Sequence, residues 1–79
     1  MNSVSTEYRS EYFRARVAEG RAVGRAQAKA EDIVTVLESR GLILSADDRA
    51  RITGCTDLGQ LDAWLRRVGS VATAGELFD

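Results

Sequence analysis

The sequence lacks several residues that small proteins use to stabilise a thin core or to perform catalysis. It has no histidine and a single cysteine, Cys55, so it can form neither an intrachain disulfide nor an ordinary zinc site. No apolar run is long enough to span a membrane, and the N-terminus lacks the basic-then-apolar order of a signal peptide. We therefore expect a cytoplasmic protein with no metal, no cofactor and no membrane partner.

The length of the chain sets a second limit. With 79 residues the chain supports one domain at most. Domains below roughly 70–80 residues usually need a disulfide, a metal or a partner chain to be robust. Because the first two are excluded, we expect a homo-oligomer, most simply a dimer.

The charges are unevenly distributed, although the net charge is only −1. Residues 1–30 carry six basic and three acidic groups, which gives +3, and residues 31–79 carry five basic and nine acidic groups, which gives −4. This asymmetry favours an antiparallel or head-to-tail contact between chains, or a weak electrostatic attraction to nucleic acid.

Proline, the strongest helix breaker, is absent from the whole chain. Small or apolar residues recur from Tyr8 to Leu37 at a mean spacing of about 3.6, which predicts one long helix over about residues 7–40. Gly41 follows Arg40 and is predicted to end this helix in the left-handed conformation of a C-terminal cap.

The remaining chain is punctuated at short intervals by capping residues and glycines. Ser45 with Asp48 predicts a helix over about residues 46–53, and Thr56 is the predicted cap of an amphipathic helix that ends at Gly69. A capping box of Thr73 and Glu76 opens a last turn. No alternating run predicts a strand. The predicted fold is all-α, with one long helix followed by three short helices that form a small C-terminal lobe.

We divide the chain into a long-helix oligomerisation or connector segment, residues 1–30, and the helical lobe, residues 31–79. The apolar residues of the second segment suffice for one compact core. The predicted core consists of Ile33, Val36, Leu37, Ile52, Leu58, Leu61, Trp64, Leu65, Val68 and Leu77.

The middle of the long helix contains a tetrapeptide repeat, residues 19–30, of the form x-small-basic-Ala. It places small residues on two helix faces, which lets a second helix approach closely; the alternative is a flexible connector. Three aromatic residues nearer the N-terminus, Tyr8, Tyr12 and Phe13, add a partner surface, unless the first turns are disordered. The predicted dimer interface consists of Tyr8, Tyr12, Ala15, Ala18, Gly20, Ala22, Gly24, Ala26 and Ala30.

The same repeat contains a row of basic side chains, Arg21, Arg25 and Lys29, on one face of the helix. Such a row can follow the phosphates of a nucleic acid. Because it has only three charges and the rest of the chain is acidic, a solvated face or an acidic partner is the preferred interpretation, and nucleic-acid binding is the alternative function.

The remaining reactive side chains are predicted to be structural. Trp64 shares a face with leucines and is expected in the core, and Cys55 has no adjacent base and is expected to be a buried small residue. Asp47 and Asp48 lie in a first helical turn, where acidic groups favour the helix dipole. No combination of residues suits a metal, an activated nucleophile or an acid–base pair, so the chain is not expected to be an enzyme.

Five short sequence stretches occur in an order that resembles that of a known protein family. They are residues 33–42, IVTVLESRGL, then residues 48–52, DRARI, residues 55–58, CTDL, residues 61–67, LDAWLRR, and residues 72–78, ATAGELF. This order resembles the helical C-terminal domain, of unknown function, of the bacterial recombination-promoting nucleases, which are transposase-related proteins. The glycine- and alanine-rich repeat is similar to the connector of that family, so the resemblance covers about residues 19–79.

The resemblance implies a non-catalytic module. In that family an N-terminal domain cleaves DNA with acidic residues and a lysine around a metal. The sequence here has one lysine, Lys29, in the context Gln27-Ala28-Lys29, with no upstream aspartate, and we interpret this pattern as chance. The resemblance also implies oligomerisation and, as a further partner, a cognate full-length nuclease that the module restrains.

Overall fold

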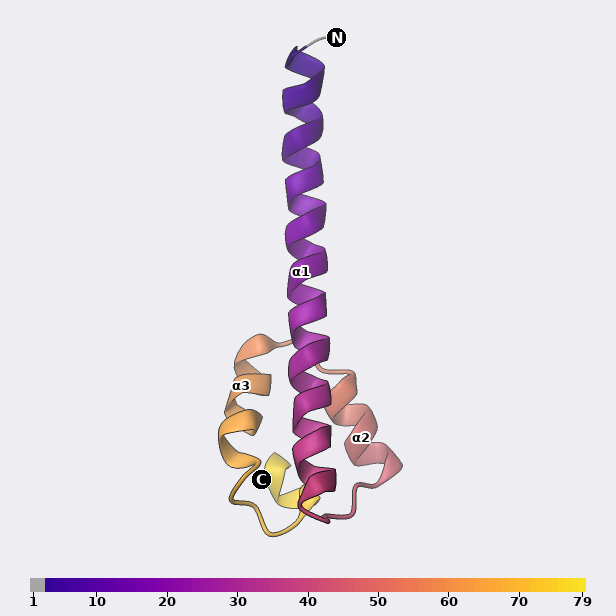
Figure 1. Cartoon of the computed structure of the whole chain (residues 1–79), viewed down its shortest axis with the longest axis vertical. Coiled ribbons are helices and arrows are strands. Elements are labelled where there is room, and N and C mark those ends of the chain that lie inside the picture. Colours follow the sequence, from indigo (N-terminus) through magenta and orange to yellow (C-terminus); the bar gives the residue numbers. More distant parts are fainter. Residues whose placement is uncertain (1–2) are drawn as a thin grey trace.

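The structure, a computed structural model, describes the backbone of residues 3–79 and the side chains of residues 20–79. Its elements are α1 (Ser3–Ser39), α2 (Ala46–Thr53), α3 (Leu58–Arg67) and the 3₁₀ helix η1 (Ala74–Phe78). The described residues therefore form an all-helical fold, as predicted (Figure 1). The last predicted helix is a 3₁₀ helix of five residues instead of an α-helix, a geometry typical of such short pieces.

The end of α1 shows how closely local sequence controls the turn. Gly41 has φ 77°, the left-handed conformation that glycine adopts without a Cβ clash. The amide of Leu42 donates to the Leu37 carbonyl at 3.0 Å, and the amide of Gly41 donates to the Glu38 carbonyl at 2.9 Å. This pair of bonds is the Schellman motif, and it confirms Gly41 as the predicted cap.

The short helices begin at side-chain caps. The Ser45 hydroxyl accepts from the Asp48 amide at 3.0 Å, as predicted. At α3 the cap is Asp57 and not Thr56: its Oδ1 accepts from the amides of Gly59 and Gln60 at 2.9 and 3.2 Å. A carboxylate at this position binds the free amides and also interacts favourably with the positive helix end. The cap Thr73 accepts from the Glu76 amide at 3.3 Å.

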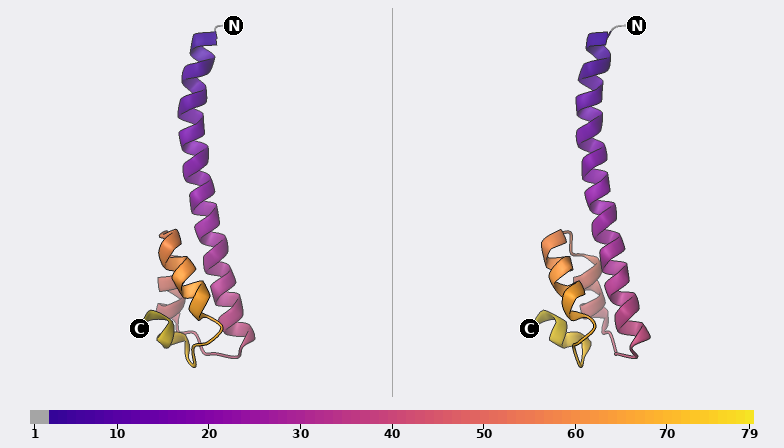
Figure 2. Two further views of the ribbon diagram at one scale, coloured as in Figure 1. Left: turned by 90° about the vertical axis from the view of Figure 1, so that its left-hand side faces the viewer. Right: turned by 60° about the vertical axis from the view of Figure 1, so that its left-hand side comes forward.

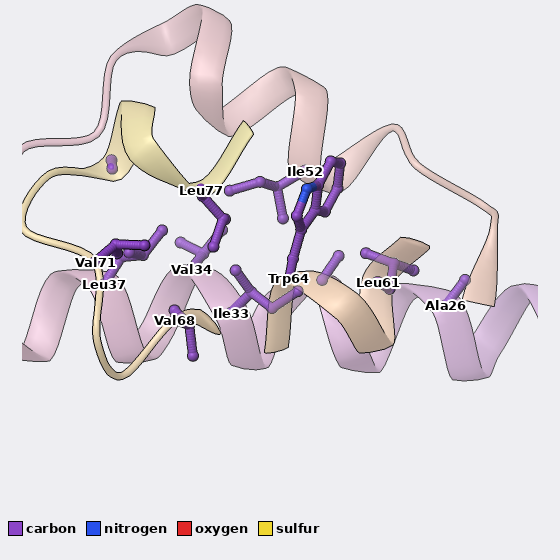
Figure 3. Close-up of a cluster of buried hydrophobic side chains, with 12 residues drawn as sticks. Ala26, Ile33, Val34, Leu37, Ile52, Leu61, Trp64, Val68, Val71 and Leu77 are labelled. Carbon is purple, nitrogen blue, oxygen red and sulfur yellow. The ribbon is translucent and has the colours of Figure 1, made fainter. Parts of the chain in front are cut away.

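The core lies where α2, α3 and η1 pack against the C-terminal part of α1 (Figure 3). We call α2, α3, η1 and their connecting loops the lobe. Of the predicted core residues, Val36, Leu58 and Leu65 are only partly buried. The buried cluster consists of Ala26, Ala30, Ile33, Val34, Leu37, Ile52, Leu61, Trp64, Val68, Val71, Ala74 and Leu77. It begins at Ala26, so the predicted boundary at residue 30 falls inside the packed region.

Aromatic and arginine side chains fasten η1 to the rest of the lobe. The rings of Trp64 and Phe78 meet edge to face, with centroids 5.2 Å apart, and the guanidinium of Arg51 lies 4.7 Å from the centre of the Phe78 ring. Arg67 donates to the carbonyls of Glu76, Leu77 and Asp79 at 2.8, 3.0 and 3.0 Å. These contacts fix a segment that is too short to be stable on its own.

The arrangement leaves much of α1 without a neighbour. The molecule measures 59 × 20 × 19 Å, and α1 extends well beyond the lobe (Figure 1). Side views show α2, α3 and η1 gathered on one side of the C-terminal half of α1, while its other side is bare (Figure 2). Over the residues searched, no helix has a stretch both long and apolar enough to cross a bilayer.

Candidate self-association surface on the long helix

The part of α1 just before the lobe is uncovered. All six residues from Gly20 to Arg25 are exposed, and Val23 is 49% exposed although it is apolar. A Cβ placed on Gly20 or Gly24 would meet no atom within 4 Å. The chain itself therefore does not require glycine at either position, and each glycine weakens the helix by about 1 kcal/mol relative to alanine.

The predicted dimer interface is corrected at two positions. Ala26 and Ala30 are each 1% exposed because they share a helix face with Ile33 and Leu37, and the lobe covers that face. They are therefore closed to a second chain. Gly20, Ala22 and Gly24 are exposed, which leaves them available. The side chains of Tyr8, Tyr12, Ala15 and Ala18 lie outside the described residues.

The second small-residue face of the repeat points away from the lobe. At about 100° per residue, Ala28 lies about 160–200° around the helix from Ala26 and Ala30. Exposed residues continue this face in both directions at helical spacing. We call it the outward strip, and it consists of Arg21, Gly24, Ala28, Asp32, Thr35 and Ser39, all of them exposed. The strip therefore lies on the side of α1 opposite to the buried Ala26 and Ala30.

Of the three residues in the predicted basic row, Lys29 forms an ion pair with Asp62. The Lys29 ammonium donates to Asp62 Oδ1 of α3 at 2.6 Å, with the two side chains 28% and 40% exposed. The hydrogen bond from Lys29 is the main cause that lowers the pKa of Asp62 below its ordinary value. Lys29 therefore links α1 to α3, and the exposed residues of the basic row are Arg21 and Arg25.

The other candidate residues have structural surroundings. Trp64 is 8% exposed and belongs to the core, as predicted. Cys55 is half-buried, which is less than predicted, and its thiol lies 3.7 Å from the carbonyl oxygen of Asp57. Among the residues that the structure describes, no three His, Cys, Asp or Glu side chains come together as a potential metal site.

Several polar contacts between separate elements of the described chain had no signal in the sequence. Besides Lys29 with Asp62, Arg40 donates to the Val68 carbonyl at 2.8 Å, and Arg67 binds the three carbonyls around η1. Each arginine reaches a backbone oxygen, and every residue has one, so the sequence alone cannot identify the acceptor. Only the relative placement of the helices determines these pairs.

Comparisons of this chain with family models, curated proteins and solved structures find no significant match. The resemblance to the C-terminal domain of recombination-promoting nucleases therefore remains a prediction.

Proposed function

We propose that this chain is a non-catalytic interaction module that self-associates through α1. The observation that carries the proposal is the length of this helix relative to the lobe. The packed core begins at Ala26, whereas α1 begins at Ser3, and the side chains from Gly20 to Arg25 make no core contact.

A helix in this position needs a partner for a physical reason. Isolated helices of modest length are marginal in water, and the stability of most protein helices comes from packing one face. Gly20 and Gly24 make the uncovered part weaker still. A second copy of the chain can cover the exposed part of α1 without any other protein. In a two-fold dimer the same contact covers this part of the helix in both copies.

Nucleic-acid binding has less support. It requires several free cations along one face. Lys29 is paired with Asp62, and Asp32 adds a negative charge to the strip that carries Arg21. Two arginines, with an aspartate about 10 Å or more further along the helix, form a weak site for a phosphate backbone and a better one for a surface with both signs of charge.

The non-catalytic part of the proposal is supported by what the polar side chains do within residues 20–79. Ser45, Asp57 and Thr73 cap helices. Asp62 and Glu38 pair with basic side chains of neighbouring elements. These are contacts that stabilise a fold.

Light scattering on the intact chain and two matched variants tests the proposal. Ala28 and Ala50 are both exposed alanines inside helices, but Ala28 lies on the outward strip and Ala50 on α2. The wild-type chain and Ala50→Leu should be dimeric at high concentration, whereas Ala28→Leu should shift toward the monomer. A wild-type chain that remains monomeric, together with a salt-sensitive micromolar affinity for duplex DNA, would replace this proposal with nucleic-acid binding.

A further inference from the structure

The outward strip carries opposite charges on the two sides of Ala28. Arg21 stands at the N-terminal end, with Arg25 at its flank, and Asp32 stands eight residues after Gly24 on the same strip. Among the side chains of residues 20–79, the ion pairs within 4.0 Å are Lys29 with Asp62 and Arg49 with Glu38. Arg21, Arg25 and Asp32 therefore form no ion pair within this part of the chain.

We propose that a second copy of this chain docks antiparallel on the outward strip, with Ala28 near the two-fold axis and Asp32 between the partner's Arg21 and the partner's Arg25. The inference rests on the proposed self-association and adds its face, direction and register. The occupant is a second copy because the strip complements its own charges.

Helix geometry supports the register. With a rise of about 1.5 Å per residue, Asp32 lies about 6 Å along the axis from Ala28. On the antiparallel partner, Arg25 lies about 4.5 Å and Arg21 about 10.5 Å from Ala28 on that same side of the two-fold axis. Asp32 therefore falls between the two arginines, within the reach of both side chains, and the symmetry repeats the arrangement at the other end.

The direction follows from the signs of the charges. A parallel pair in register would bring Arg21 against Arg21 and Asp32 against Asp32, and both contacts repel. An antiparallel pair brings unlike charges together at both ends and places Ala28 at the centre, with Gly24 about 6 Å from it along the axis. Small residues there allow the helix axes to approach to the short end of the usual range, about 8 Å.

The lobes do not obstruct this pair. The outward strip is on the side of α1 that faces away from α2, α3 and η1 (Figure 2). In the antiparallel dimer each lobe lies on the outer side of its own helix, and the two lobes sit toward opposite ends. Because the partner's helix ends at Ser39, 11 residues after Ala28, it runs beside α1 back to about residue 17, so the bare residues 20–25 gain a neighbour.

A charge-reversal series measured by sedimentation equilibrium tests the pairing. Asp32→Arg alone, and Arg21→Glu with Arg25→Glu, should each raise the dimer dissociation constant about tenfold or more, since each turns attraction into repulsion at both ends. The triple variant that combines all three substitutions should regain most of the wild-type affinity. Asp47→Arg changes the net charge as much as Asp32→Arg, but on exposed α2, and should leave the dissociation constant unchanged.

Spin labels at Ser39 then report the direction. A Ser39→Cys label, placed in a Cys55→Ser background, should show a distance of about 33 Å between the two copies, from 22 residues at about 1.5 Å each. A separation near one helix diameter, about 10 Å, would indicate a parallel pair and overturn the inference. If the charge reversals leave the dimer dissociation constant unchanged, the proposed register is wrong, although self-association still holds. A wild-type chain that is monomeric contradicts both proposals.

Discussion

Replacement by leucine is expected to affect the stability of the lobe differently at two alanines of α1 that are only two residues apart. Ala30 is 1% exposed inside the core, whereas Ala28 is exposed on the outward strip. Alanine and leucine are both good helix formers, so the change to leucine tests packing and not helix propensity. Extra methyl groups in a packed core force neighbours to move and typically cost about 1–3 kcal/mol. Ala30→Leu should therefore destabilise the lobe, and Ala28→Leu should change its stability by less than about 0.5 kcal/mol.

Urea unfolding followed by the fluorescence of Trp64 measures this difference. The chain has one tryptophan, and it lies buried against Phe78, so its emission reports the lobe alone. For a domain of this size, a loss of about 2 kcal/mol also lowers the melting temperature by about 10 °C. Low protein concentration, about 1 μM, limits the contribution of association to the measured stability. Equal midpoints for Ala28→Leu and Ala30→Leu would refute the assignment of the two helix faces.

Three further outcomes are expected. Gly20→Ala should increase helix content in circular dichroism, because its Cβ meets no atom within 4 Å and alanine favours the helix by about 1 kcal/mol; a loss of helix content would show a close neighbour at Gly20. Arg67→Met should destabilise the lobe by about 2 kcal/mol in urea unfolding through loss of three charged hydrogen bonds to carbonyls, while Arg66→Met at an exposed position should have little effect. The pKa of Asp62 is lowered in the folded state, so the contribution of its carboxylate to the free energy of unfolding is complete above the ordinary carboxyl pKa of about 3.9. This contribution disappears as the pH falls through the lower folded pKa. Asp62→Asn should therefore remove this part of the pH dependence of the free energy of unfolding, and an unchanged pH dependence would contradict the role of Asp62.

The parts of the fold that could be predicted are those that local sequence determines. Gly41 ends α1 in the predicted conformation, and Ser45 and Thr73 cap the helices that they were predicted to cap. The amphipathic spacing of Leu58, Leu61, Leu65 and Val68, with Trp64 beside them, predicted the side of α3 that faces the core. Leu61, Trp64 and Val68 are buried there, while Leu58 and Leu65 are only partly buried. The cap Asp57 was missed because Thr56, beside it, is also a good capping residue.

The face of α1 that the lobe covers was indicated only in part by the sequence. Ala26 and Ala30 are in helical register with Ile33 and Leu37, which were predicted in the core, but the repeat places alanine or glycine on both faces, so side-chain size alone gives no preference for Ala26 and Ala30 over Gly24 and Ala28. The lobe decides which face is covered, and its position depends on contacts between distant residues. Lys29 and Asp62, which hold α3 on one side of α1, are 33 positions apart.

Hydrogen exchange at two protein concentrations tests most directly whether a second copy covers the bare part of α1. Amides of residues 20–25 are the ones to follow, because these residues lie in α1 but outside the core. The account predicts that their protection rises clearly between about 1 and 100 μM chain, by mass action on a dimer, while residues 61–68 of the lobe are protected at both concentrations. Exchange of residues 20–25 that is equally fast at both concentrations would contradict it.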